Sequence, residues 1–183
     1  MTPGTLCCYR TDADGKIIFV DEGWCAFARE NGAPEYAVPE ALYGRELLSF
    51  ISEPTTLHIY SVLMQRVMNH RQWIKLPFRC DAPDVRRWLE LEMRPWEGGI
   101  EFRTRTLRSE PRPVPFPFDR RGGGDTMLRM CSWCKQVELD PGRWAAVEEA
   151  VGRFHLFGDA AVPQITHGIC PACVGLFERD PRR

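Results

Sequence analysis

The last third of the chain contains two Cys-x-x-Cys pairs, Cys131-Ser-Trp-Cys134 and Cys170-Pro-Ala-Cys173, with 35 residues between them. A turn of this kind directs both of its sulfur atoms toward one point, so each pair can supply half of a tetrahedral metal site. Thiolates suit Zn²⁺, which takes four ligands in structural sites. Because four thiolates leave no open coordination position, the spacing predicts a structural rather than a catalytic zinc ion.

The same cysteines allow three other interpretations. Two disulfides would need an oxidising compartment, which nothing in the sequence indicates. A thioredoxin-like dithiol normally uses one pair beside a βαβ pattern, not two pairs on either side of one helix. His167 could replace one cysteine, but a histidine beside four complete cysteine ligands more often supports them from outside. The prediction is therefore a zinc ion bound by Cys131, Cys134, Cys170 and Cys173.

The bulk composition excludes several classes of protein. The 183 residues suffice for one ordinary domain and a small second one, and the formal net charge is −1. Residues 127–183 carry seven basic and seven acidic side chains, so the basic excess typical of nucleic-acid binding is absent, as is a polybasic patch for membranes. Without a signal peptide or an apolar run of about 18 residues, we expect a soluble cytoplasmic protein with no membrane contact.

The beginning of the chain predicts a hairpin followed by a short helix. Apolar runs at residues 5–10 and 16–20 are joined by an Asp-Gly turn, a pattern typical of a β-hairpin. Asp21 is placed to cap an amphipathic helix that ends at Asn31-Gly32, where a left-handed residue can stop it. An irregular stretch with short helical pieces follows.

A longer helix and three strands come next. The helix runs from residue 54 to about residue 69, with a predicted buried stripe of Leu57, Tyr60, Met64 and Val67. Apolar and polar residues alternate in residues 74–80, 89–94 and 100–103, so each strand has one face in a core and one in water. On the polar faces we expect solvated charge ladders, formed by Arg86, Arg87, Arg103 and Arg105 with Glu90, Glu92 and Glu101. Five antiparallel strands with helices on one face form an α+β layer.

This order of elements, together with three short motifs, resembles a PAS domain. The motifs are Tyr9-Arg-Thr-Asp-Ala-Asp-Gly15, Ile18-Phe-Val-Asp-Glu-Gly-Trp24 and Phe27-Ala-Arg-Glu-Asn31. The resemblance covers residues 4–109. It implies a half-barrel in which the five-stranded sheet and its helices enclose a pocket for a small ligand or cofactor, in a domain that commonly forms homodimers.

Residues 110–126 separate this domain from the cysteine pairs. Alternating prolines precede Gly122-Gly-Gly124, so we predict a linker that is extended at first and flexible afterwards. Residues 127–183 form a second domain that is too small to rely on its core alone, and a bound metal would stabilise it. Within it, Trp144, Val147, Val151 and Phe154 recur at helical spacing and should pack over the metal site.

Three stretches of this second domain also resemble the cysteine-rich tail that follows PAS and receiver modules in bacterial signalling proteins. They are Met130-Cys-Ser-Trp-Cys-Lys135, the region from Trp144 to Glu149, and Thr166-His-Gly-Ile-Cys-Pro-Ala-Cys173. This chain departs from many such proteins because it carries no kinase, cyclase or DNA-binding output of its own.

The PAS resemblance raises the question of a bound cofactor. A haem would need a histidine in the pocket, but His58 falls opposite the predicted stripe and His70 falls at the helix end. The cysteine-containing stretch of covalent flavin photosensors is missing, and the Cys170-Pro171 pair alone is a weak haem-regulatory signal. Cys25 and Cys80 fall in apolar registers, so we expect small buried hydrophobes; the alternative is an oxidant-sensing thiol or a thiol ligand in the pocket.

The sequence shows no enzyme signature, neither a P-loop nor a dinucleotide glycine fingerprint nor Gly-x-Ser-x-Gly. We therefore expect a non-catalytic bacterial sensory protein that passes its signal to a protein partner by direct contact. Two alternatives belong to other classes. One is a redox switch in which oxidation of the zinc thiolates releases the metal, and the other is a zinc-dependent transcription regulator, which the charge balance disfavours.

Overall fold

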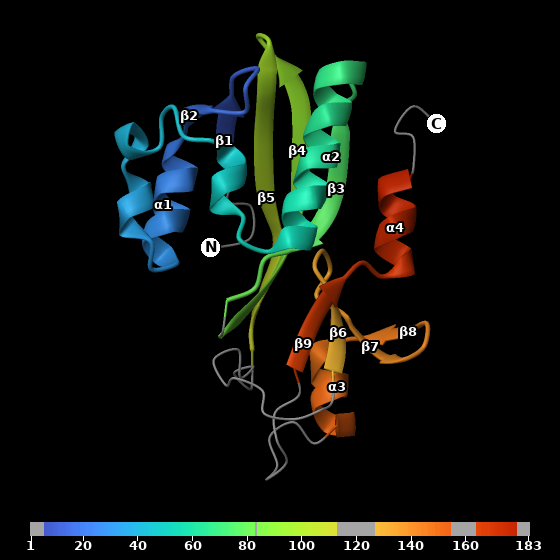
Figure 1. The fold of residues 1–183 in the computed structure, drawn as a ribbon. Coiled ribbons are helices and arrows are strands. Elements are labelled where there is room, and N and C mark those ends of the chain that lie inside the picture. Colours follow the sequence, from blue (N-terminus) through green and yellow to red (C-terminus); the bar gives the residue numbers. More distant parts are fainter. Residues whose placement is uncertain (1–5, 83, 113–126, 155–163, 179–183) are drawn as a thin grey trace. The chain divides into compact units, whose positions relative to one another are not determined.

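The computed structural model describes residues 6–82, 84–112, 127–154 and 164–178 (Figure 1). These residues form two compact units, one on each side of residue 113. Most of the predicted linker, residues 110–126, lies outside the described residues, but its first positions continue the last strand of the N-terminal unit. Both units combine strands and helices, so the predicted α+β class is confirmed.

The N-terminal unit is built on an antiparallel sheet of five strands. In chain order they are β1 (Leu6–Thr11), β2 (Ile17–Val20), β3 (Ile74–Arg79), β4 (Val85–Trp96) and β5 (Gly99–Pro111). In space the order is β2-β1-β5-β4-β3, so the first strand pairs with the last. The predicted five-stranded antiparallel sheet is confirmed. Strands β4 and β5 are longer than predicted because they pair with each other well beyond their apolar alternation.

The predicted capped helix at the N-terminus is also present. Helix α1 spans Glu22–Glu30, and one carboxylate oxygen of Asp21 accepts a hydrogen bond from the backbone N–H of Trp24 at 2.9 Å. The other oxygen accepts from the backbone N–H of Cys8 at 2.9 Å, which ties the helix start to β1. After α1 the chain turns at Gly32, whose φ of 74° is left-handed, as a helix stop requires.

Three short 3-10 helices connect α1 to a long helix. They are η1 (Pro34–Ala37), η2 (Pro39–Ala41) and η3 (Leu47–Phe50). The long helix α2 spans Pro54–His70, and Glu53 caps it by accepting from the backbone N–H groups of Thr55 and Thr56, each at 2.8 Å. Figure 1 shows α1 and α2 over the same face of the sheet, where α1 contacts β1 and α2 contacts β4 and β5.

The buried stripe of α2 shares only Val67 with the predicted one. Its buried residues are Ile59, Leu63 and Val67, which follow one another at intervals of four, whereas Leu57 is exposed. Both stripes are apolar in the sequence, so periodicity alone does not choose between them. Packing against the sheet selects the first stripe, and Tyr60 and Met64 come to lie at its margin, half-buried.

The polar face of the sheet carries part of the predicted charge ladder. Arg103 pairs with Glu101 and Arg105 with Glu90, each at 2.8 Å. The prediction of a solvated side chain is wrong for Glu101, which is buried. It is also wrong for Arg87, which is buried and has its guanidinium carbon 5.8 Å from the ring centroid of Phe27 on α1. The reason is strand alternation, since positions 87, 89, 91 and 93 of β4 are all buried together.

The C-terminal unit contains a four-stranded sheet with two helices. The strands are β6 (Met127–Cys131), β7 (Val137–Asp140), β8 (Arg143–Ala145) and β9 (Gln164–Gly168), and their spatial order is β8-β7-β6-β9. The helices are α3 (Val147–Phe154) and α4 (Pro171–Glu178). Strands β6 and β9 run parallel, so the residues that follow each strand leave the sheet at the same end.

The predicted helix of this unit begins later than its apolar spacing indicates. Trp144 lies in β8, where it pairs with Glu138 of β7, and α3 begins only at Val147. Strand pairing therefore takes the backbone hydrogen bonds that a longer helix would have needed. Val147 and Ala150 of α3 are buried in a core formed with Leu128, Met130, Val137, Leu139 and Ala145 of the sheet.

Candidate metal centre and ligand cavity

The parallel pairing of β6 and β9 brings the two cysteine pairs together. Cys131 is the last residue of β6 and is in register with Gly168, the last residue of β9. Cys134 lies in the turn after β6, and Cys170 follows β9 directly before α4. Cys173 lies in the first turn of α4 and is buried. Two segments far apart in the sequence therefore each present two sulfur atoms at one end of the sheet.

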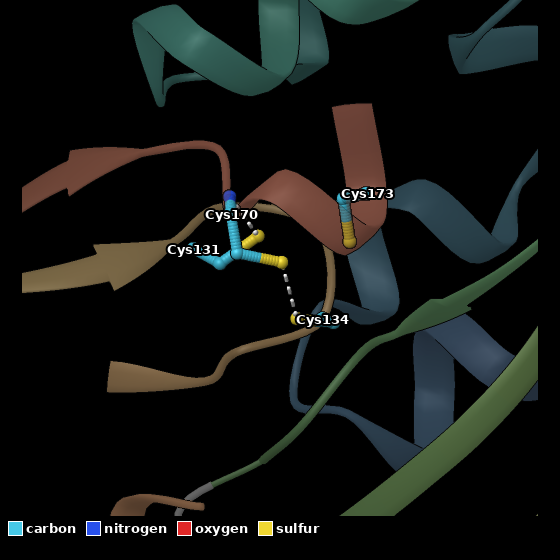
Figure 2. A group of neighbouring side chains, drawn as sticks. All are labelled: Cys131, Cys134, Cys170 and Cys173. Carbon is cyan, nitrogen blue, oxygen red and sulfur yellow. Dashed lines mark hydrogen bonds between the residues drawn. The ribbon is translucent and has the colours of Figure 1, made fainter. Parts of the chain in front are cut away.

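The geometry of the four sulfur atoms suits a tetrahedral metal ion. The Sγ atoms of Cys131, Cys134, Cys170 and Cys173 all lie within 4.8 Å of one another. Those of Cys134 and Cys170 are 3.7 Å apart. Figure 2 shows the four side chains, which come from the first cysteine turn and from the start of α4. Four sulfur atoms that are each about 2.3 Å from one zinc ion lie about 3.8 Å from one another. These four side chains can therefore hold a metal ion with little rearrangement.

Backbone hydrogen bonds fix the first cysteine turn. The N–H of Cys131 donates to the carbonyl of Gln136 at 2.7 Å, and the N–H of Lys135 donates to the carbonyl of Cys131 at 3.0 Å. Lys135 has a left-handed φ of 61°, which closes the turn tightly. The N–H of Ser132 donates to the carbonyl of Gly168 at 2.8 Å, so this turn is also tied to the end of β9.

Hydrogen bonds among the thiols separate their pKa values. Contacts with Cys134 and then Cys173 hold the pKa of Cys131 well below its ordinary value. The hydrogen bond to Cys131 raises the pKa of Cys134 to about 12, and hydrogen bonds to Cys131 and Cys134 raise the pKa of Cys173. A cation bound here would release protons from the thiols that are still protonated, since a metal binds the thiolate form.

His167 and His58, the two histidines considered as possible ligands from the sequence, belong neither to the cysteine cluster nor to the lining of the cavity. His167 lies in β9, is exposed, and is not part of the four-cysteine cluster. His58 on α2 is exposed, as predicted, and does not line the cavity of the N-terminal unit. The structure thus gives neither histidine a ligand-binding position among the described residues.

The N-terminal unit contains a cavity of about 320 Å³ on the face of the sheet that the helices cover. Residues of β1, β3, β4, β5, α1, α2, η1 and η3 line it, and half of them are aromatic: Tyr9, Trp24, Phe27, Tyr36, Phe50, Tyr60 and Phe78. Its polar lining residues include Tyr9, Tyr60 and Thr104, each of which carries a hydroxyl. The volume and the largely apolar lining are those of a small-molecule site.

The thiols of this unit have different positions relative to the cavity. Cys80, which the sequence singles out, lines it, whereas Cys25 is buried elsewhere. Cys7 also lines it, and its place two residues before Tyr9 in an alternating strand is the signal that could have found it. Burial raises the pKa of Cys7 and of Cys25, so both thiols stay protonated and unreactive at neutral pH.

Comparison with known proteins does not assign the chain to a family. No family model matches it, and no match is found among curated proteins. Among the described residues, no helix is long and apolar enough to cross a membrane.

Proposed function

We propose that this protein is a non-catalytic sensory module of the PAS type. Its N-terminal unit binds a small ligand, and its C-terminal unit passes the signal on by contact with a protein partner. The observation that carries the proposal is the cavity of about 320 Å³ between the five-stranded antiparallel sheet and the helices on one of its faces. The order of two strands, short helices, one long helix and three strands supports the PAS assignment, because it is the order that the sequence resemblance implies.

We also propose that the four-cysteine cluster holds one structural Zn²⁺. Four thiolates are a closed ligand set, and the sulfur spacing suits a tetrahedral ion of this size. The described part of the C-terminal unit is small, so metal binding would supply a large share of its folding free energy. Zinc would therefore keep the partner-binding unit folded rather than take part in a reaction.

The cellular setting of the proposal follows from the same resemblance. We propose a bacterial cytoplasmic protein that forms homodimers through its N-terminal unit, as PAS domains commonly do. The output would be a protein contact, since the sequence contains no recognisable enzyme or DNA-binding signature.

The two alternatives find less support. A redox switch requires thiols that oxidants reach, but three of the four clustered cysteines are buried. A transcription regulator requires a basic surface for DNA, but residues 127–183 carry equal numbers of acidic and basic side chains.

Native mass spectrometry of the purified full chain, together with elemental analysis and an absorption scan, tests the proposal. The expected result is one zinc ion per chain, no haem or flavin band, and a mass increment or a thermal shift with small apolar compounds. Absence of zinc, with four thiols that cannot be titrated until a reductant is added, would instead indicate two disulfides. A Soret band would show that a haem occupies the protein and would overturn the colourless-ligand proposal.

A further inference from the structure

The lining of the N-terminal cavity selects for flat, apolar molecules. Of its fourteen described lining residues, seven are aromatic and none is charged. The rings of Tyr9 and Trp24 meet edge to face with centroids 5.0 Å apart, and those of Tyr36 and Phe50 do so at 5.2 Å. Aromatic rings in such arrangements offer both faces and edges, which favour a ligand that is itself aromatic.

The polar groups of the lining form a row of hydroxyls. Thr104 is hydrogen-bonded to Tyr9, and Tyr9 is hydrogen-bonded to Tyr60. Burial raises the pKa of both tyrosines, so the row is uncharged at neutral pH. Because each hydroxyl can donate one hydrogen bond and accept two, the row can add a hydrogen bond with one ligand hydroxyl.

Two other polar side chains of the lining, those of Trp24 and Asn31, donate hydrogen bonds within the protein. The indole Nε1–H of Trp24 donates to the carbonyl of Tyr36 at 3.0 Å, and the amide of Asn31 donates to the carbonyl of Phe27 at 2.8 Å. The row of Thr104, Tyr9 and Tyr60 therefore offers a ligand a set of linked hydroxyls in a largely apolar cavity.

Two arginines contact lining rings without lining the cavity themselves. The guanidinium carbon of Arg45 lies 4.4 Å from the ring centroid of Phe50, and that of Arg87 lies 5.8 Å from that of Phe27. Because no charged residue lines the cavity itself, a ligand carboxylate inside it would lose hydration without a counter-charge in direct contact, which is unfavourable.

The size of the cavity limits the ligand further. An apolar cavity of about 150 Å³ in another protein stays dry and binds benzene. The present cavity, at about 320 Å³, has room for one or two rings, and it lies at the lower end of the range for ligand pockets.

Building on the proposed ligand-binding role of this cavity, we infer that its ligand is an uncharged molecule of one or two aromatic rings that carries one hydroxyl group. The rings lie among the aromatic side chains of the cavity. The hydroxyl bonds to the row formed by Thr104, Tyr9 and Tyr60.

Isothermal titration of the full-length protein with four probes tests this inference. The probes are naphthol, naphthalene, naphthoate and octanol, which differ in the hydroxyl, the charge and the aromatic ring. Naphthol should bind most tightly, about tenfold more tightly than naphthalene, because one hydrogen bond is lost in the latter. Naphthoate and octanol should each bind at least about tenfold more weakly than naphthol.

Two variants locate the binding. Ala28→Leu fills the cavity from α1 and should weaken naphthol binding at least about tenfold, while the matched Ala41→Leu, at an exposed position of η2, should bind like the wild type. Thr104→Val removes one hydroxyl with little change of side-chain shape. It should reduce the difference in binding affinity between naphthol and naphthalene. The thermal unfolding of each variant shows that it is folded.

The outcomes separate this inference from the function on which it rests. If naphthoate or octanol binds more tightly than naphthol, and Ala28→Leu abolishes that binding, the inference of an uncharged aromatic ligand is overturned. The proposed ligand-sensing role of the cavity is then retained. Binding of no probe, or equal binding to the wild type and Ala28→Leu, would overturn the use of the cavity itself. A preference for naphthol that survives Thr104→Val would overturn the hydroxyl row as its recognition element.

Discussion

Trp133 and Phe177 join the two halves of the candidate metal centre, with ring centroids 5.1 Å apart and ring planes at 82°. Trp133 lies between Cys131 and Cys134 in the first cysteine turn, and only 2% of its surface is exposed. Phe177 lies on α4, one turn after Cys173. This edge-to-face contact therefore connects the two cysteine pairs at a second point, beside the sulfur cluster.

Substitution of Trp133 should loosen the metal centre although no ligand is removed. Trp133→Ala deletes a buried aromatic side chain, which costs about 3–5 kcal/mol in protein cores. The expected result is faster transfer of the metal to a chelator and a lower urea midpoint for the C-terminal unit. The control is Trp73→Ala, since Trp73 is 58% exposed and its loss should change neither quantity. Equal chelator rates in wild type and Trp133→Ala would contradict the proposed role.

Removal of one metal ligand should unfold the C-terminal unit alone. Cys131→Ser leaves three thiols in the cluster, which hold zinc far less tightly, and metal binding free energy is folding free energy in such a unit. We expect loss of zinc by elemental analysis and loss of dispersed amide signals from residues 127–154 and 164–178, with those of residues 6–82 and 84–112 retained. Cys8→Ser, a cysteine outside the cluster, should keep one zinc per chain. Retention of zinc and of both signal sets in Cys131→Ser would contradict the four-cysteine site.

The cysteine pairs and the hairpin were predictable because each is encoded over a few residues. The spacing of the pairs also predicted that they share one metal site, but the parallel pairing of β6 with β9 that brings them together was not predictable, because it links segments more than thirty residues apart. Local apolar spacing also could not choose between Leu57 and Ile59 on α2, since only the sheet decides which face is covered. The PAS resemblance led us to expect a pocket between the sheet and its helices, but the aromatic lining of the cavity was not predicted, because its residues come from eight separate elements.

A buried carboxylate on the polar face of the sheet should make stability depend on pH. Glu101 has no exposed side-chain surface and accepts from the Nε atoms of Arg10, Arg94 and Arg103, each at 2.8 Å. Burial alone would raise the pKa of Glu101, but the hydrogen bonds from the three arginines outweigh it, and the pKa is lowered from 4.5. Its contribution to stability is complete above the unfolded pKa and is lost as the pH falls below 4.5 through the folded pKa.

Glu101→Gln should therefore lower the urea midpoint at neutral pH and flatten its fall between neutral and acidic pH. At neutral pH the three arginines lose their anion, and a broken buried pair costs about 3–5 kcal/mol. Urea unfolding at several pH values measures both effects. Glu40→Gln, at an exposed position, should reproduce the wild-type profile. If the urea midpoint of Glu101→Gln changes with pH in parallel with that of the wild type, Glu101 is not the group that makes stability depend on pH.

Loss of the cap of α1 should destabilise the N-terminal unit. Asp21→Ala removes the acceptor for the backbone N–H groups of Trp24 and Cys8, and a lost helix cap costs about 1 kcal/mol. The second contact adds to this cost because Cys8 belongs to β1, so we expect about 1–3 kcal/mol in total. Urea unfolding measures the difference. Asp14→Ala, in the exposed hairpin turn, should cost less than about 0.5 kcal/mol.

The close approach of β5 to the end of β1 should exclude any side chain at Gly99. A Cβ atom there would lie 1.8 Å from the carbonyl oxygen of Thr11 and 2.7 Å from its carbon. Both are backbone atoms, so the clash can be relieved only if the pairing of β1 with β5 opens. In that pairing Thr11 is in register with Ile100. Gly99→Ala should therefore lower the unfolding free energy by about 3 kcal/mol or more.

The matched change Gly152→Ala should act in the opposite direction. Gly152 is exposed in α3, and a Cβ added there meets nothing within 4 Å. Alanine restricts the unfolded chain and favours the helix, so this variant should gain about 0.5–1 kcal/mol in its own unit. Urea unfolding followed by the amide signals of each unit compares the two variants. A Gly99→Ala protein as stable as the wild type would show that β1 and β5 tolerate a wider separation at this point, and that the cavity between the sheet and its helices is less rigid than the strand pairing indicates.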